Sequence, residues 1–194
     1  MKDWIRKIIE EKKRLLENLS QGYIDQVEQA GAVLADILKA GNKILLAGNG
    51  GSAADAQHFA GEIVGRFTME RKSLPAISLC VDPSVMTCIA NDYGYEQTFA
   101  RQIDGLGNKG DAFIAISTSG NSPNLINALS AAKQRGLTTV ALLGKDGGKM
   151  KGLCDYPLVV PSSCTPRIQE THTLTVHILC QMIEQEIFSA DGSK

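Results

Sequence analysis

A chain of 194 residues is long enough for one substantial domain and short for two. Its composition is that of a globular protein, and its net charge of −1 excludes the basic surface typical of nucleic-acid-binding proteins. Five cysteines without a Cys-x-x-Cys pair indicate neither a disulfide framework nor a thiolate zinc site, which fits a reducing cytoplasm. The longest apolar runs have strand length and the N-terminus is charged, so we expect neither a membrane span nor a signal peptide.

Two helices are predicted before the first strand. Ile5–Leu19 carries apolar residues at helical spacing, and a second helix runs to about Ala40 and stops at Gly41, a residue type typical of helix ends. Short apolar runs then predict five strands, at Lys43–Ala47, Ala76–Leu79, Ala112–Ile116, Thr138–Leu142 and Leu158–Val160. Segments of helical period lie between and after them, at Ser52–Arg66, Ser84–Asn91 continuing through Gln97–Leu106, Ser122–Arg135, Gly148–Cys154 and Pro166–Phe188.

Strands that alternate with helices predict right-handed crossovers and a mainly parallel sheet. The run Ile44 to Ala47 is apolar without alternation, as expected of a strand that is buried on both faces. We therefore expect an α/β three-layer sandwich in a single domain over residues 1–194. Within it, N-terminal helices occupy 1–40, the core 41–188 and a polar tail 189–194.

The first predicted strand leads into a glycine loop, Gly48-Asn49-Gly50-Gly51-Ser52, and then into a helix. Glycines let the backbone adopt positive φ and approach a ligand closely. We expect Ser52 to cap the helix, with Asp55 as its capping-box partner, and the free N–H groups of such a helix start favour an anion. A tight turn without any ligand explains the same residues equally well. The loop matches neither the Walker pattern nor the G-x-G-x-x-G pattern.

The third predicted strand ends in a hydroxyl loop, Ser117-Thr118-Ser119-Gly120-Asn121-Ser122-Pro123. Ser122 is expected at the N-cap of the next helix and Pro123 at its first position. Hydroxyls and helix N–H groups can surround a phosphate without Lys or Arg, although serine-rich turns also occur without a ligand. Because ligands of open parallel sheets bind at the carboxyl ends of strands, two such loops at strand ends favour a binding site.

Two helices carry side chains of metal-ligating type. His58 and Glu62 have i,i+4 spacing, which places both on one helix face. Gln169 and His177 are eight residues apart on the last helix and point to roughly the same side, whereas His172 lies about 140° away from His177. The mixed nitrogen and oxygen set of His58, Glu62, Gln169 and His177 suits zinc or another first-row divalent ion. A lone helical histidine is, however, more often a core or surface residue.

The run Gly48–Ala60, with the sequence G-N-G-G-S-A-A-D-A-Q-H-F-A, resembles the signature of phosphoheptose isomerases, members of the sugar isomerase (SIS) domain group. Further matches follow in the same order at Ile89–Gly94, Ile116–Ser122, Gly144–Gly148 and Arg167–Glu170, so that the resemblance covers the chain from about Gly41 to Glu186. It implies a flavodoxin-like SIS fold with a five-stranded parallel sheet between helices, assembled as a homotetramer.

The resemblance also implies an activity, the isomerisation of sedoheptulose 7-phosphate to D-glycero-D-manno-heptose 7-phosphate through an enediol. This is the first step of bacterial heptose synthesis for lipopolysaccharide and other surface polysaccharides. The family's zinc ligands, one ion per subunit, fall on His58, Glu62, Gln169 and His177, and its catalytic pair falls on Glu62 and His177. We expect substrate contacts at Asn49, Gly50, Gly51, Ser52, Glu62, Asn91, Asp92, Ser117, Thr118, Ser119, Ser122 and Gln169.

Other functions remain open at this point. An SIS-fold interaction protein that binds a replication initiator shares many of these motifs, but it lacks the acidic and histidine residues that match Glu62 and His177. Sugar-phosphate-sensing SIS modules are attached to DNA-binding domains, and this sequence contains no basic or helix-turn-helix segment. An isomerase of another phosphosugar would use the same loops, since nothing in them fixes the length or stereochemistry of the sugar.

Overall fold

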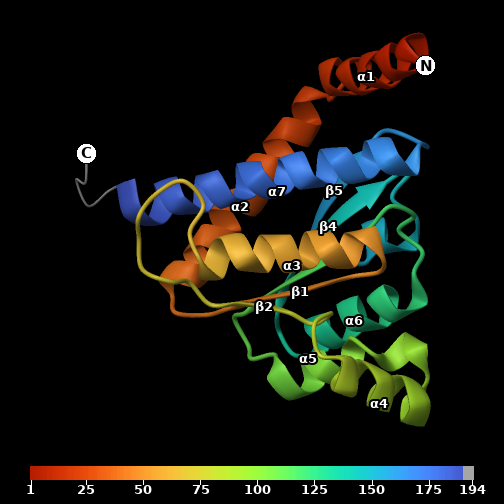
Figure 1. Ribbon diagram of the computed structural model, residues 1–194. Helices are drawn as coiled ribbons and strands as arrows, with labels where there is room; N and C mark the ends of the chain where they lie inside the picture. The colour runs from red at the N-terminus through yellow and green to blue at the C-terminus, as the bar shows by residue number, and fades with distance from the viewer. Residues whose placement is uncertain (190–194) are drawn as a thin grey trace.

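The computed structural model describes residues 1–189, so the predicted polar tail lies outside the described residues except for Ser189. Within this range seven α-helices and five strands alternate (Figure 1). The helices are α1 (Lys2–Glu17), α2 (Gln21–Lys39), α3 (Gly51–Val64), α4 (Pro83–Tyr93), α5 (Ala100–Leu106), α6 (Pro123–Gln134) and α7 (Thr165–Phe188). The strands are β1 (Ile44–Gly48), β2 (Ala76–Ser78), β3 (Ala112–Ser117), β4 (Thr138–Gly144) and β5 (Tyr156–Val160). No helix in residues 1–189 combines the length and apolarity needed to cross a membrane.

All five strands run parallel in the order β2-β1-β3-β4-β5, which confirms the predicted α/β fold. Ile44 and Leu46 of β1 face a core that α2, α3 and α7 cover, while Leu45 and Ala47 face a second core with α5 and α6. Figure 1 shows these helices as separate layers on the two sides of the sheet, with α1 projecting from one of them. Burial on both faces explains why the strand sequences are almost continuously apolar.

The order in which strands are added to the sheet reverses at β1, because β2 lies on one side of β1 and β3 on the other. Residues Ile44 to Gly48 of β1 pair with Ala112 to Ile116 of β3, although β2 lies between them in sequence. The carboxyl ends of these two strands therefore meet at the topological switch point, where open parallel sheets bind ligands. This arrangement brings the glycine loop after β1 and the hydroxyl loop after β3 to one edge of the sheet.

Two of the predicted helical segments, Gln97–Leu106 and Gly148–Cys154, are shorter than expected as α-helices. The stretch predicted as Ser84–Asn91 continuing through Gln97–Leu106 is not one continuous helix, because α4 is capped by Gly94 with φ of 89° and a short 3-10 turn at Tyr95–Gln97 follows before α5 begins. Glycine in this conformation ends a helix where other residues would be strained. The segment Gly148–Cys154 forms only a 3-10 turn, at Lys149–Gly152. The other predicted elements occur with bounds shifted by a few residues.

His172 on α7 is a core residue, not a ligand. Its side chain is fully buried, and its Nε2 lies 3.0 Å from the carbonyl oxygen of Leu143 on β4. The pKa of His172 is lowered from 6.5 to about 4, mainly by burial and to a smaller extent by the charge of Lys12, while the bond to the Leu143 carbonyl acts in the opposite direction. The imidazole is therefore neutral at pH 7 and donates from Nε2 to this carbonyl. His172, predicted to lie about 140° away from His177 on the helix, thus points into the core.

The buried His172 should make stability pH-dependent in a defined window. Between pH 6.5 and about 4 the unfolded chain takes up a proton at His172 that the folded chain excludes, so stability is lost as pH falls through this window. The full difference corresponds to about 3 kcal/mol. The variant His172→Gln, which can still donate to the Leu143 carbonyl, should lose this contribution. Urea unfolding of both proteins at pH 7, 5.5 and 4.5 measures this contribution. If the unfolding free energies of the wild type and the variant fell equally with decreasing pH, the assignment would be contradicted.

Candidate functional site

α3 and α7 bring three ligating side chains together. The donor atoms of His58, Glu62 and His177 all lie within 4.8 Å of one another. His58 and Glu62 are one turn apart on α3, with 3.0 Å between Nε2 and Oε1. The Nε2 of His177 lies 3.4 Å from the Nε2 of His58, although the two residues are 119 positions apart in sequence. The long-range pairing that spacing alone could not establish is therefore present.

This donor set fits a divalent cation. Two imidazole nitrogens and one carboxylate form the three-ligand set typical of zinc sites that leave a position open for another ligand. The His58 and Glu62 side chains are 40% and 24% exposed, so an ion can reach them from solvent. The ring of Phe67 lies beside the His177 imidazole, with 5.3 Å between the two ring centroids. His58, Glu62 and His177 could thus hold a metal ion at a partly open site.

Gln169 lies two turns before His177 on α7, and its amide lies against the glycine loop. A Cβ atom at Gly51 would lie 2.5 Å from the Nε2 of Gln169, so a side chain at this position would displace the Gln169 amide. The expected fourth ligand therefore faces the first residue of α3. It links the glycine loop to the helix that carries His177.

Ser52 and Asp55 differ from their expected capping roles. α3 begins at Gly51 with Gly50 as its N-cap, so Ser52 lies inside the first turn, where its side chain is buried and caps nothing. Asp55 turns toward α7 and accepts a hydrogen bond from the hydroxyl of Thr173 at 3.0 Å, while its other carboxylate oxygen is buried without a partner among the described residues. Burial raises the pKa of Asp55, which the Thr173 bond and the charge of His58 partly offset.

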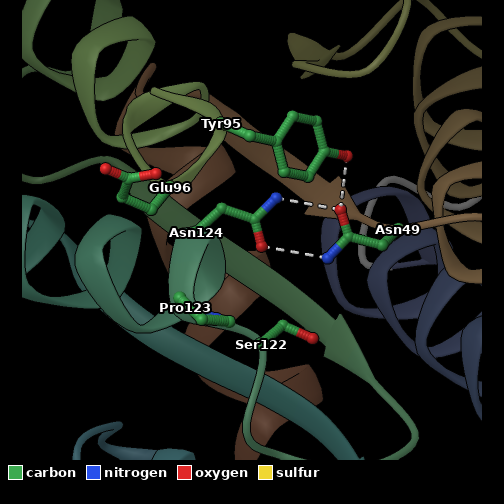
Figure 2. Close-up of a pocket in the computed structure, with 6 residues that line it drawn as sticks. All are labelled: Asn49, Tyr95, Glu96, Ser122, Pro123 and Asn124. Carbon is green, nitrogen blue, oxygen red and sulfur yellow. Dashed lines mark hydrogen bonds between the residues drawn. The ribbon is translucent and has the colours of Figure 1, made fainter. Parts of the chain in front are cut away.

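A second part of the site is a pocket of about 400 Å³ at the switch point (Figure 2). Asn49 and the buried Asn124 exchange two hydrogen bonds, of 3.0 and 2.9 Å, and the Tyr95 hydroxyl donates to the Asn49 Oδ1 at 2.9 Å. The pocket is lined by Asn49, Tyr95, Glu96, Ser122, Pro123 and Asn124. Because both ends of the Asn49 amide are bonded, its orientation at the pocket wall is fixed.

The hydroxyl loop closes this pocket from the β3 side. The Ser117 Oγ lies 3.5 Å from the Ser119 Oγ and 3.4 Å from the Ser122 Oγ, and it accepts from the backbone N–H of Gly120 at 3.1 Å. Gly120 has φ of 63°, and a Cβ there would collide with the Gly147 carbonyl oxygen. Ser122 occupies the N-cap of α6 and Pro123 its first position, as predicted, although the Ser122 hydroxyl makes no cap hydrogen bond.

Three further residues are expected to contact the substrate: Thr118, Asn91 and Asp92. Thr118 is half-buried between Ser117 and Ser119. Asn91 and Asp92 are exposed in the last turn of α4, where the Asn91 amide donates to the Asp92 carboxylate at 2.8 Å. Within residues 1–189 neither makes a hydrogen bond to any expected site residue outside this pair.

Sequence reasoning missed three residues that shape the site: Tyr95, Phe67 and Asn124. Tyr95 directly follows the Ile89–Gly94 motif, and Asn124 directly follows the predicted Ser122-Pro123 helix start. Their positions beside motifs were available signals, whereas their contacts to Asn49 required the fold. Phe67 lies in a segment without any pattern, and nothing in the sequence connected it to His177.

Comparisons with known proteins agree with this arrangement. A model of the SIS domain family matches residues 7–144. A phosphoheptose isomerase from Trichlorobacter lovleyi is 52% identical over 188 residues, which cover 97% of this chain and 96% of the relative. A phosphoheptose isomerase from Sulfurimonas denitrificans is 51% identical over 192 residues, which cover 99% of this chain and 97% of the relative. The solved phosphoheptose isomerase from Neisseria gonorrhoeae has a TM-score of 0.90 at 40% identity, covering 95% of this chain and 98% of that one.

The three-residue cluster predicts binding of a divalent cation. We expect the purified protein to bind Co²⁺ or Zn²⁺, and His177→Asn to weaken this binding at least about tenfold, because one of three ligands is lost. Isothermal titration calorimetry measures the affinity. His172→Gln is the matched control, since His172 is buried away from the cluster, and it should bind like the wild type. Unchanged affinity in His177→Asn would show that these residues do not form the cation site.

Proposed function

Because the chain belongs to the phosphoheptose isomerases of the SIS domain family, we propose that it converts sedoheptulose 7-phosphate into D-glycero-D-manno-heptose 7-phosphate. It would thereby carry out the first step of bacterial heptose synthesis. The observation that carries this proposal is the convergence of Glu62 and His177, from separate helices, to within 4.8 Å. An interaction protein has no need for such a carboxylate–imidazole pair, whereas the two groups are suited to serve as general base and general acid in proton transfer.

Ketose–aldose isomerisation moves a proton between two neighbouring carbons. One proton leaves C1, an enediol forms, and a proton is added at C2, while the oxygen on C2 gains a proton and the oxygen on C1 loses one. In our proposal the Glu62 carboxylate serves as the base at carbon, and the His177 imidazole exchanges protons with the oxygens from the other side. Both groups stand at the partly open cluster, where a substrate can reach them.

We propose zinc as the metal, one ion per subunit, with His58, Glu62 and His177 as ligands and Gln169 as the fourth that the family resemblance implies. When bound, the ion would supply Lewis-acid polarisation of a carbonyl or hydroxyl oxygen. Ligation occupies the lone pairs that Glu62 and His177 need for proton transfer. The ion is therefore either held weakly enough to exchange or bound in a resting state, and turnover measured over a zinc series distinguishes the two.

The substrate phosphate is assigned to the hydroxyl loop. Three hydroxyls, those of Ser117, Ser119 and Ser122, converge there at the start of α6, whose first N–H groups favour an anion. The sugar would extend along Asn49, Gly50, Gly51 and Gln169, with Thr118, Asn91 and Asp92 as further contacts. The contact between Gln169 and Gly51 supports a continuous path from this loop toward α7.

We also propose that the chain forms a homo-oligomer, a tetramer as in the family resemblance, in the cytoplasm. Leu174 and Ile178 on α7 are 39% and 41% exposed, and Trp4 on α1 is 63% exposed, which supports association through these helices. All five cysteines are free, as expected in a reducing compartment. Light scattering of the purified protein measures the assembly.

A panel of ketose phosphates of five to seven carbons tests the proposed activity, with products identified by NMR. Sedoheptulose 7-phosphate should give the highest kcat/KM. Preference for a shorter sugar would identify an isomerase of another phosphosugar. Absence of turnover together with capture of a replication initiator would identify an interaction protein.

Removal of either proton-transfer group should abolish most of the activity. We expect Glu62→Gln and His177→Gln each to lower kcat at least about 100-fold, because a general acid or base contributes on the order of 10²–10⁴. Steady-state kinetics with circular dichroism as the folding control measures this. Near-normal turnover in both folded variants would remove these residues from the mechanism.

The phosphate assignment predicts a different kinetic pattern. Ser119→Ala removes one of the hydroxyls that would bind the phosphate in both ground and transition state, so KM should rise more than kcat falls. Measurement of both parameters for the wild type and the variant decides this. An unchanged KM would place the phosphate elsewhere.

A further inference from the structure

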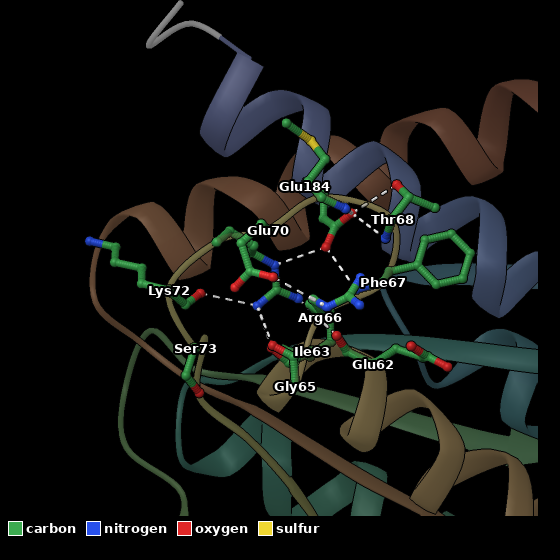
Figure 3. Close-up of polar contacts among 12 residues, drawn as sticks. Glu62, Ile63, Gly65, Arg66, Phe67, Thr68, Glu70, Lys72, Ser73 and Glu184 are labelled. Atoms are coloured by element: carbon green, nitrogen blue, oxygen red, sulfur yellow. Dashed lines mark hydrogen bonds and ion pairs between the residues drawn. The ribbon is translucent and has the colours of Figure 1, made fainter. Parts of the chain in front are cut away.

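A buried carboxylate on α7 organises the loop that follows α3. Glu184 is 1% exposed, and its Oε1 and Oε2 accept hydrogen bonds from the backbone N–H groups of Phe67, Thr68 and Met69, each at 2.8–2.9 Å (Figure 3). The Thr68 hydroxyl donates to the same carboxylate at 3.0 Å. Burial alone raises the pKa of Glu184, but these backbone bonds outweigh it and lower the pKa. The group is therefore ionised at neutral pH.

The partner of this carboxylate, Arg71, ties the loop to the end of α3. Both side chains of the ion pair are 1% exposed, and the Arg71 Nε lies 2.9 Å from the Glu184 Oε1. The rest of the guanidinium donates to the carbonyl oxygens of Glu62 at 2.7 Å, Ile63 at 2.9 Å and Gly65 at 3.2 Å. These carbonyls belong to the last turn of α3 and the residue after it, which lack partners within the helix.

Glu184 thus reaches both members of the proton-transfer pair through its neighbours. By way of Arg71 it fixes the backbone carbonyl of Glu62. By way of the Phe67 N–H it fixes the loop whose Phe67 ring lies 5.3 Å from the His177 imidazole, inclined at 31°. Glu184 is also seven residues after His177, two helical turns, and so stands on the same side of α7. One carboxylate is therefore bonded both to the arginine that holds the Glu62 carbonyl and to the loop that carries the ring beside His177.

We propose that Glu184, with Arg71, is a positioning residue for the isomerase reaction, holding the Glu62 carboxylate and the His177 imidazole in the geometry that proton transfer needs. The inference rests on the proposed function for its kinetic part. It assigns no contact with substrate to Glu184. The Arg71–Glu184 ion pair connects the end of α3 to α7, and it lies beside the cluster of His58, Glu62 and His177 without being part of it.

Stability alone does not account for this ion pair. Replacing a buried pair by apolar side chains of similar volume is often neutral or stabilising, because desolvation offsets most of the attraction. What apolar residues cannot supply is five directed hydrogen bonds from one loop to one carboxylate. Such bonds fix the loop in a single arrangement, and a misplacement of about 1 Å at a reacting group can cost on the order of 10²-fold in rate.

The test compares Glu184→Gln with Glu186→Gln. Glu186 is two residues away on the same helix, has a side chain that is 57% exposed, and among residues 1–189 pairs only with Lys39, at 3.6 Å. With sedoheptulose 7-phosphate, we expect Glu184→Gln to lower kcat about 10- to 100-fold with KM changed by less than about threefold, and Glu186→Gln to match the wild type. An unchanged kcat in Glu184→Gln, or an equal loss in both variants, overturns the proposal.

A spectroscopic measurement separates positioning from general loosening, and it needs no substrate. The chain has three histidines, so imidazole NMR of histidine-labelled protein gives one set of signals each for His58, His172 and His177. In Glu184→Gln the His177 signals should shift or broaden, while those of buried His172 serve as the internal reference and stay in place. Unmoved His177 signals, or equal shifts in His172, overturn the proposal.

A second variant covers the case in which Glu184→Gln does not fold. Phe67→Leu keeps the loop backbone and an apolar side chain but removes the ring beside His177, and it should shift the His177 signals and lower kcat with little change in KM. If neither the His177 signals nor kcat changes in Phe67→Leu, the proposal is overturned. If the wild type itself does not isomerise sedoheptulose 7-phosphate, the proposed function fails, while the NMR comparison still decides whether Glu184 positions His177.

Discussion

The packing of α7 against α3 is the constraint on which the rest of the site depends. Along one side of α7, Gln169 lies against Gly51, Thr173 donates to Asp55, and His177 approaches His58. Two turns further on, Glu184 accepts the hydrogen bonds of the loop after α3. A shift of one helix along the other would disturb all these polar contacts together. The apolar core beneath both helices, over one face of the sheet, holds them in this register.

The sheet supplies the second fixed element. Because β1 and β3 are neighbours, the glycine loop and the hydroxyl loop end side by side, and the pocket between them is bounded by side chains from both. The paired amides of Asn49 and Asn124 connect the two loops directly. A binding pocket at rigid strand ends and reactive groups on packed helices together give a preorganised site, since each functional side chain is held by an element that is itself buried.

The site combines two kinds of chemistry that occupy different layers. Hydroxyl and backbone N–H groups, which suit an anion, gather at the loop after β3, whereas imidazoles and a carboxylate, which suit proton transfer or a metal, gather between α3 and α7. Gln169 stands between them through its contact with Gly51. A phosphorylated polyol has an anionic end and a reactive end, so a division of this kind matches its chemistry.

Local sequence determined much of this protein. Unbroken apolar runs gave the strands, helical period gave most of the helices, and the motif order from Gly48 to Glu170 identified the family. Where a single residue overrides a periodic pattern, prediction went wrong: Gly94 interrupts the helical segment around it, and Gly50 rather than Ser52 precedes α3. These are local backbone preferences that side-chain period does not report.

Only the tertiary structure decided which polar groups meet. The distance between His58 and His177, the amide pair of Asn49 and Asn124, and the contacts of Glu184 with the loop at Phe67 each join segments 75 to 119 residues apart. Such contacts result from the burial of apolar faces of helices and strands, which a sequence pattern shows one element at a time. How two elements pack depends on the shapes of both, and that information exists only in the folded chain.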